Sequence, residues 1–170
     1  MILPSVVVVL VPYSMKYGWL LPVQGLFFDK MAIRKQEFYE GAALHVLARA
    51  GGITSILYDA PFFLINSHLL VLLKYSTRTR SPWGFTFTPA EQELLQEKGS
   101  ELRTIIGLVC GADGIAAFPY DAYLKIAAPR KGAIHVSCYR QHREHYEVNG
   151  PDGKLAGKVP PSTWQRILES

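Results

Sequence analysis

The sequence predicts a single domain of the α/β or α+β class with a strand-rich C-terminal tail. Three observations lead to this class. They are a helical pattern of apolar residues over positions 32–50, three short β-type runs between positions 53 and 74, and a strong helix start at Thr88. The chain has 170 residues, enough for one domain with a real core. We therefore predict one folded unit over positions 31–170.

The first 28 positions differ from the rest of the chain, because Lys16 is their single charged residue. Pro12 and Lys16 interrupt the apolar run, so a membrane-spanning helix is not expected. Two interpretations stay open. Positions 1–28 are an apolar arm that contacts a protein partner or a second copy in a homodimer. Alternatively, positions 1–30 are a start-site artefact, because Met31 opens a convincing helix.

The predicted first helix covers positions 32–50 and ends at two consecutive glycines. Phe38, Ala42, His45 and Leu47 lie close to one face of this helix. We expect that face to point into the core, with His45 as a core histidine that has a hydrogen-bond partner.

The three β-type runs cover positions 53–57, 62–65 and 69–74, and the last two are joined by a short turn. The third run ends on Lys74 after an unbroken apolar stretch. A lysine at the end of a buried strand is costly to desolvate, so its side chain either reaches for solvent or has a function.

The remainder of the chain predicts short elements in a mixed order. Thr88 and Glu91 form the reciprocal pattern of a capping box that opens a helix ending near Lys98. The later predictions are strands at 103–110 and 115–118, a short helix at 120–126, strands at 133–139, 146–148 and 154–157, and a last short helix around Trp164.

The net charge and the cysteine content exclude few classes of function. The formal net charge is +4 and the sequence pI is about 9.1, which is compatible with a polyanionic partner without requiring one. Cys110 and Cys138 both lie in predicted strands, and the chain has no CxxC motif. Free, buried thiols in a reducing cytoplasm are the expected state.

A basic stretch follows the third β-type run. Lys74, Arg78 and Arg80 are accompanied by the hydroxyl groups of Ser76 and Thr77. Lysine, arginine and hydroxyl side chains make most contacts to nucleic-acid phosphates, so these five residues are candidate nucleic-acid contacts.

Two neighbouring patterns have simpler interpretations. Trp83 follows the basic stretch and could stack on a base, but a tryptophan in a strand is more often in the core. Positions 138–145 contain Cys138, His142 and His145, but alternation puts Cys138 and His142 on one face and His145 on the other, and the neighbouring arginines repel cations. A solvated basic strand is favoured there over a zinc site.

The order of elements and the run from Pro61 to Ile65, followed by Leu72-Leu73-Lys74, resemble the restriction-endonuclease-like, or PD-(D/E)XK, nuclease superfamily over positions 31–127. In that family a first helix commonly carries a glutamate, a strand brings an aspartate, and the next strand brings Glu-x-Lys or Gln-x-Lys. The resemblance implies a mixed central sheet flanked by helices and metal-dependent hydrolysis of DNA. It also implies that Lys74 and Glu40 are the catalytic residues.

The sequence departs from this family at the metal-binding positions. Phe63 and Leu72 stand beside Lys74 where the resemblance places acidic residues, and neither can supply the oxygen ligands that Mg²⁺ or Mn²⁺ needs. The first expectation is therefore a nuclease-like domain that binds DNA and is weakly active or inactive. An active endonuclease that binds its metal through Asp59 and Glu40 is the second, and a structural or protein-binding domain is the third.

Overall fold

The computed structural model describes residues 32–169. The predicted N-terminal arm, its partner surface at positions 1–28 and the start-site question lie outside the described residues. The helices are α1 (Lys35–Ala50), α2 (Pro89–Gly99), α3 (Tyr120–Leu124) and the 3-10 helix η1 (Pro161–Arg166). The strands are β1 (Ile56–Asp59), β2 (Phe62–Ile65), β3 (Leu69–Ser76), β4 (Trp83–Phe87), β5 (Arg103–Cys110), β6 (Ile115–Pro119), β7 (Ile134–Tyr139), β8 (Glu147–Gly150) and β9 (Gly153–Lys154).

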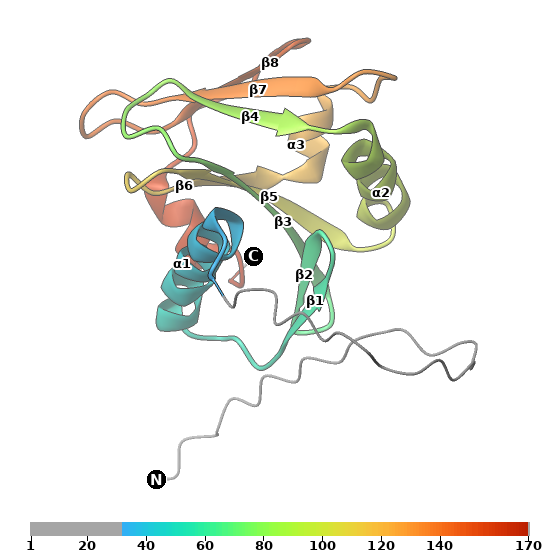
Figure 1. Cartoon of the computed structure of the whole chain (residues 1–170), viewed down its shortest axis with the longest axis vertical. Helices are drawn as coiled ribbons and strands as arrows, with labels where there is room; N and C mark the ends of the chain where they lie inside the picture. The colour runs from blue at the N-terminus through green and yellow to red at the C-terminus, as the bar shows by residue number, and fades with distance from the viewer. Residues whose placement is uncertain (1–31, 170) are drawn as a thin grey trace, which may run out of the picture.

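The strands form two sheets that lie one above the other (Figure 1). Sheet A has the order β1-β2-β3-β5-β6, and sheet B has the order β4-β7-β8-β9. Within sheet A, β3 and β5 are parallel and the other neighbours are antiparallel. The described residues therefore show a mixed α/β architecture with two sheets and a few helices, which is compatible with the predicted α+β class.

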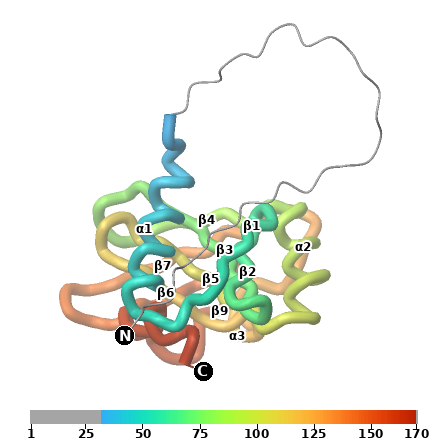
Figure 2. Tube along the Cα trace, turned by 90° about the horizontal axis from the view of Figure 1, so that it is seen from below, coloured from blue at the N-terminus to red at the C-terminus, as the bar shows by residue number. Residues whose placement is uncertain are grey.

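Sheet A has a separate apolar core on each of its faces. On one face, Leu70 and Leu72 pack with sheet B, α2 and α3. On the other face, Val71 and Leu73 pack with α1 and η1, and α1 lies on the viewer's side of sheet A in Figure 2. Because β3 is covered on both sides, its apolar residues run without a break instead of alternating with polar ones.

Helix α1 turns a different face to the core than its sequence pattern predicts. Its buried residues are Glu40, Ala43 and Leu47, whereas Phe38 is 63% exposed and His45 is exposed. The expectation of a core histidine is therefore wrong. The reason lies far along the chain: Trp164 of η1 donates its indole N–H to the Ala43 carbonyl at 2.9 Å, and this contact fixes the rotation of the helix.

Several local predictions are confirmed. Thr88 Oγ1 accepts the Glu91 amide at 3.3 Å, and Glu91 Oε2 accepts the Thr88 amide at 2.8 Å, so α2 begins with the predicted capping box. Cys110 and Cys138 are free and buried. Between residues 32 and 169 there is no helix with the length and apolar character needed to cross a membrane.

Candidate nucleic-acid interface

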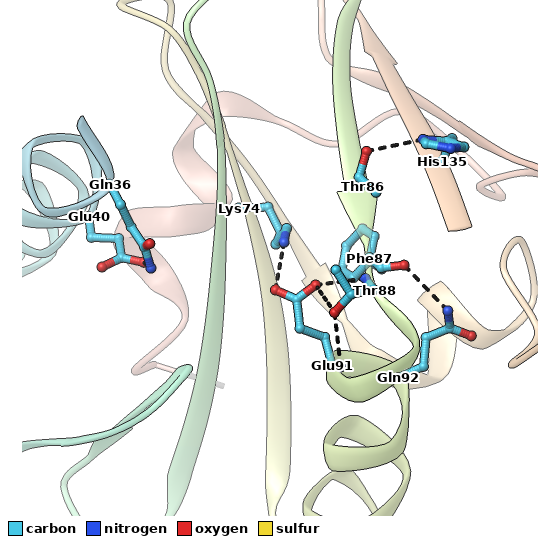
Figure 3. Close-up of polar contacts among 9 residues, drawn as sticks. All are labelled: Gln36, Glu40, Lys74, Thr86, Phe87, Thr88, Glu91, Gln92 and His135. Atoms are coloured by element: carbon cyan, nitrogen blue, oxygen red, sulfur yellow. Dashed lines mark hydrogen bonds and ion pairs between the residues drawn. The ribbon is translucent and has the colours of Figure 1, made fainter. Parts of the chain in front are cut away.

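Lys74 lies near the end of β3 and forms an ion pair across the face that α2 covers. Its Nζ lies 2.7 Å from Glu91 Oε1 of α2, and both side chains are 19% exposed. The ammonium group also lies 5.5 Å from the centroid of the Phe87 ring. Figure 3 shows Lys74 and Glu91 pointing toward each other on one side of β3. The Lys74 charge is thus matched by a neighbouring element.

Glu91 is held in its ionised form by the groups around it. Burial acts to raise the pKa of its carboxyl, but hydrogen bonds from Lys74 and from Thr88 outweigh burial and lower this pKa below its ordinary value. One carboxylate oxygen binds Lys74, and the other accepts hydrogen bonds from the Thr88 amide and hydroxyl. Glu91 therefore caps α2 and neutralises Lys74 at once.

Phe63 does not lie beside Leu72 and Lys74, so that part of the sequence prediction is wrong. The register of β2 and β3 places Phe62 opposite Leu72 and Phe63 opposite Val71. Cross-strand partners share a face of a sheet, so Phe63 points to the α1 side with Val71. Phe62 is the residue that shares the face of Leu72 and Lys74, and it is also apolar. No carboxylate from β2 or β3 therefore accompanies Lys74 on this face.

Glu40 lies on the other side of β3, where Figure 3 shows it with Gln36. The Gln36 side-chain amide donates to Glu40 Oε1 at 2.8 Å, and Glu40 is 6% exposed. Burial raises the pKa of the Glu40 carboxyl above its ordinary value, while the Gln36 hydrogen bond acts to lower it. Lys74 also lowers this pKa through its charge, but the ion-pair partner of Lys74 is Glu91.

Asp59 is separated from Glu40 by sheet A. Asp59 pairs in register with Phe62 on the α2 side of the sheet, and its carboxylate binds Lys98 of α2. Residues 32–169 contain no group of three histidine, cysteine, aspartate or glutamate side chains placed to share a metal ion. Asp59 and Glu40 thus face opposite sides, and together they do not fit a divalent metal ion.

The other predicted contact residues lie at the last position of β3 and on the loop that follows it. Ser76 is buried, and its hydroxyl accepts the Arg78 amide at 3.5 Å. Thr77, Arg78 and Arg80 are exposed. The Arg78 guanidinium donates to the Pro82 carbonyl at 2.8 Å, and the indole of Trp83 donates to the Arg78 carbonyl at 2.9 Å. Trp83 is buried, as predicted, and anchors the loop.

A second basic loop, between β7 and β8, lies against the first. The Ser81 hydroxyl donates to the Arg140 carbonyl at 3.1 Å. Arg140 forms an ion pair with Asp113 at 2.8 Å and lies 4.8 Å from the centre of the Tyr146 ring. Together with Gln141, His142 and Arg143, Arg140 and Asp113 line a cavity of about 260 Å³. We call the combined surface of Thr77, Arg78, Arg80, Arg140, His142 and Arg143 the basic rim.

The turn between β5 and β6 fixes the position of the first loop. Gly111 has φ of 58°, and a Cβ atom there would lie 2.5 Å from the Arg78 carbonyl oxygen. Only glycine fits such a close backbone approach at positive φ. The sequence pattern identified Arg78 and Arg80 as candidate contacts, but it did not place the basic segment after Tyr139 beside them. No local pattern links Ser81 to Arg140, 59 residues away.

We compared the chain with known protein families, curated proteins and solved structures. No family model, curated protein or solved structure matches it. The fold and the geometry of the basic rim are therefore the observations on which a function must be argued.

Proposed function

We propose that this protein binds nucleic acid through the basic rim, on a nuclease-like scaffold that lacks metal-binding carboxylates. The observation that carries the proposal is the hydrogen bond from Ser81 to Arg140. It joins the 77–82 loop to the 140–146 loop, so Arg78 and Arg80 share one surface with Arg143 and His142. The basic residues of the two loops thus form one extended cationic surface, although each loop alone contains only a few of them.

The charges on this surface are available to a ligand. Within residues 32–169, Arg80 and Arg143 have neither an ion-pair nor a hydrogen-bond partner for their guanidinium groups, and both are exposed. Guanidinium groups match the geometry of phosphate oxygens, and the Thr77 hydroxyl adds a further donor. Arg140 is different, because Asp113 already pairs with it. We assign Arg140 the role of supporting the loop.

The scaffold supports binding without cleavage. Helix α1 is followed by the three antiparallel strands β1, β2 and β3, then by β4 of sheet B, by α2, and by β5, which is parallel to β3. Apart from the inserted β4, this order is compatible with the restriction-endonuclease-like resemblance. Beside Lys74, however, Phe62 and Leu72 offer no oxygen ligands. The Lys74 ammonium is neutralised by Glu91, so the proposal places the phosphate contacts on the rim.

The proposal is tested by the salt dependence of binding to fluorescently labelled oligonucleotides, measured by fluorescence anisotropy. We expect the Arg80→Ala/Arg143→Ala variant to lower the slope of log K against log [NaCl] by about 1.4 to 1.8, because each lost phosphate contact removes about 0.7 to 0.9. The matched control is Lys125→Ala/Lys131→Ala, which removes two exposed charges at the opposite end of the sheets. We expect its slope to equal that of the wild type.

Two results would overturn the proposal. One is a wild-type protein that binds neither single-stranded nor duplex oligonucleotides in about 50 mM salt, a concentration low enough to favour phosphate contacts. The other is an equal slope for the rim variant and the control variant. Thermal melts of both variants show whether either result comes from unfolding. We expect both variants to stay folded, because the four substituted side chains are exposed in the wild type.

A further inference from the structure

A row of aromatic side chains leads from the surface of α1 to the start of the basic rim. Phe38 contacts Tyr39 edge to face, with ring centroids 5.4 Å apart. Tyr39 stacks on Tyr75 of β3, with centroids 5.2 Å apart and ring planes 13° from parallel. Tyr75 lies two residues before Thr77, so the row ends at the rim.

A cleft opens at the outer end of this row. It has a volume of about 350 Å³ and is lined by Ile33, Lys35, Phe38, Tyr39 and Thr77. Phe38 and Ile33 are 63% and 76% exposed, so the apolar wall of the cleft is open to solvent. Thr77 belongs both to the cleft and to the basic rim, which makes the two surfaces continuous.

The chemistry of the cleft fits one unstacked base and its phosphate. An exposed phenylalanine ring offers a π face on which any base can stack, and the ammonium of Lys35 is available to an adjacent phosphate. The nearest acidic residue on α1, Glu37, lines a different cleft with Glu40 and Tyr58. Its carboxylate accepts the Arg34 amide at 2.8 Å, and Glu37 is not among the residues that line the Phe38 cleft.

We propose that the protein prefers single-stranded nucleic acid, with one base stacked on Phe38 while Arg78, Arg80 and Arg143 contact the backbone that follows. This inference rests on the proposed function and adds the class of substrate. Bases in a duplex are paired and stacked on each other, so their faces are closed to an aromatic side chain. Stacking on Phe38 therefore stabilises the complex with a single strand only.

The experiment compares a single-stranded oligonucleotide and its duplex, each binding to the wild type, Phe38→Ala, Phe38→Trp and the control Tyr58→Ala. We expect Phe38→Ala to weaken single-strand binding by about 5- to 150-fold, which corresponds to the loss of one stacked base. Duplex affinity and the salt slope should not change, because no phosphate contact is lost. Phe38→Trp should restore affinity. Tyr58 is 44% exposed but lines the other cleft, so its removal should have no effect.

A second readout reports stacking directly. A single strand that carries 2-aminopurine should lose fluorescence on binding the wild type and Phe38→Trp, and should keep it on binding Phe38→Ala. Equal affinities of wild type and Phe38→Ala for single strands, or tighter binding of the duplex by the wild type, would overturn this inference alone. If the wild type binds no oligonucleotide, the proposed function itself fails, and the inference fails with it.

Discussion

Lys74 comes shortly before the first loop of the basic rim in the sequence, yet the fold treats the charges of Lys74 and of the rim in opposite ways. Lys74 lies in a strand covered on both faces, its side chain is 19% exposed, and Glu91 pairs with it. Arg80 and Arg143 lie on loops, are exposed, and have no ion-pair partner within residues 32–169. The lysine that looks most catalytic in the sequence is thus the one that the structure uses to join β3 to α2.

This difference follows from the cost of burying a charge. An ammonium group taken out of water needs a nearby opposite charge, and breaking such a pair leaves the partner uncompensated. A loop arginine stays hydrated, so it contributes little to stability and can exchange water for a phosphate. Substitutions in the two regions should therefore separate, with stability changing at Lys74 and binding changing at the rim.

The largest expected effect is on the stability of Lys74→Met. Methionine keeps much of the aliphatic stem but leaves the Glu91 carboxylate without its cation, so we expect a loss of about 2 kcal/mol at pH 7, less than the 3–5 kcal/mol of a fully buried pair. Urea unfolding measures this loss. The Lys74→Met/Glu91→Gln variant should recover part of it, and the salt slope of nucleic-acid binding should stay at the wild-type value.

The stability difference between the wild type and Lys74→Met should also depend on pH. The folded-state pKa of Glu91 is lowered, so its contribution to stability is full above its unfolded pKa and is lost as pH falls through the folded value. The gap between wild type and Lys74→Met should therefore close on acidification. A stable Lys74→Met variant with a reduced salt slope would show instead that Lys74 contacts phosphate.

The next effect is expected at Gly111, which holds the first loop of the rim. Gly111→Ala places a Cβ 2.5 Å from the Arg78 carbonyl oxygen at a φ of 58°, so the loop must move. We expect a loss of about 1 to 2 kcal/mol in urea unfolding and weaker oligonucleotide binding.

Gly41→Ala is the matched control for Gly111→Ala. A Cβ at Gly41 meets no atom within 4 Å, and the residue lies inside α1. We expect this substitution to stabilise the protein by about 0.5 to 1 kcal/mol and to leave binding unchanged. Destabilisation by both substitutions to the same extent would contradict the account of Gly111.

The smallest effect is expected for Glu40→Gln, on the α1 side of sheet A. Burial raises the pKa of the Glu40 carboxyl, so at neutral pH the ionised form is less favourable in the folded state than in the unfolded one. Glutamine keeps the acceptor for the Gln36 amide and removes the charge. We expect a Tm at pH 7 that is higher by about 2 to 4 °C, the range for a gain near 1 kcal/mol.

The gain from Glu40→Gln should disappear as pH falls below the unfolded pKa of glutamate, about 4.3, because Glu40 is then protonated in both states. Glu37→Gln provides the contrast. Its carboxylate accepts the Arg34 amide at the start of α1, so this substitution should lower Tm slightly. A Tm for Glu40→Gln that is below the wild type at pH 7 and approaches it on acidification would show that the ionised Glu40 carboxylate is stabilising.

The sequence by itself determined the elements that depend on neighbouring residues. The capping box at Thr88 and Glu91, the bounds of β5, and two free buried cysteines were all predicted. These features arise from hydrogen bonds within one turn and from the alternation of side chains along a strand. Both act over a few residues and can be read from a short stretch of sequence.

Only the tertiary structure decided which side chains meet. Glu91 reaches Lys74 from 17 residues away, and Trp164 orients α1 from 121 residues away. The strand register placed Phe62, and not Phe63, on the face of Lys74. Packing between distant elements selects these partners through shape and burial, and a local pattern carries no information about what a distant segment brings.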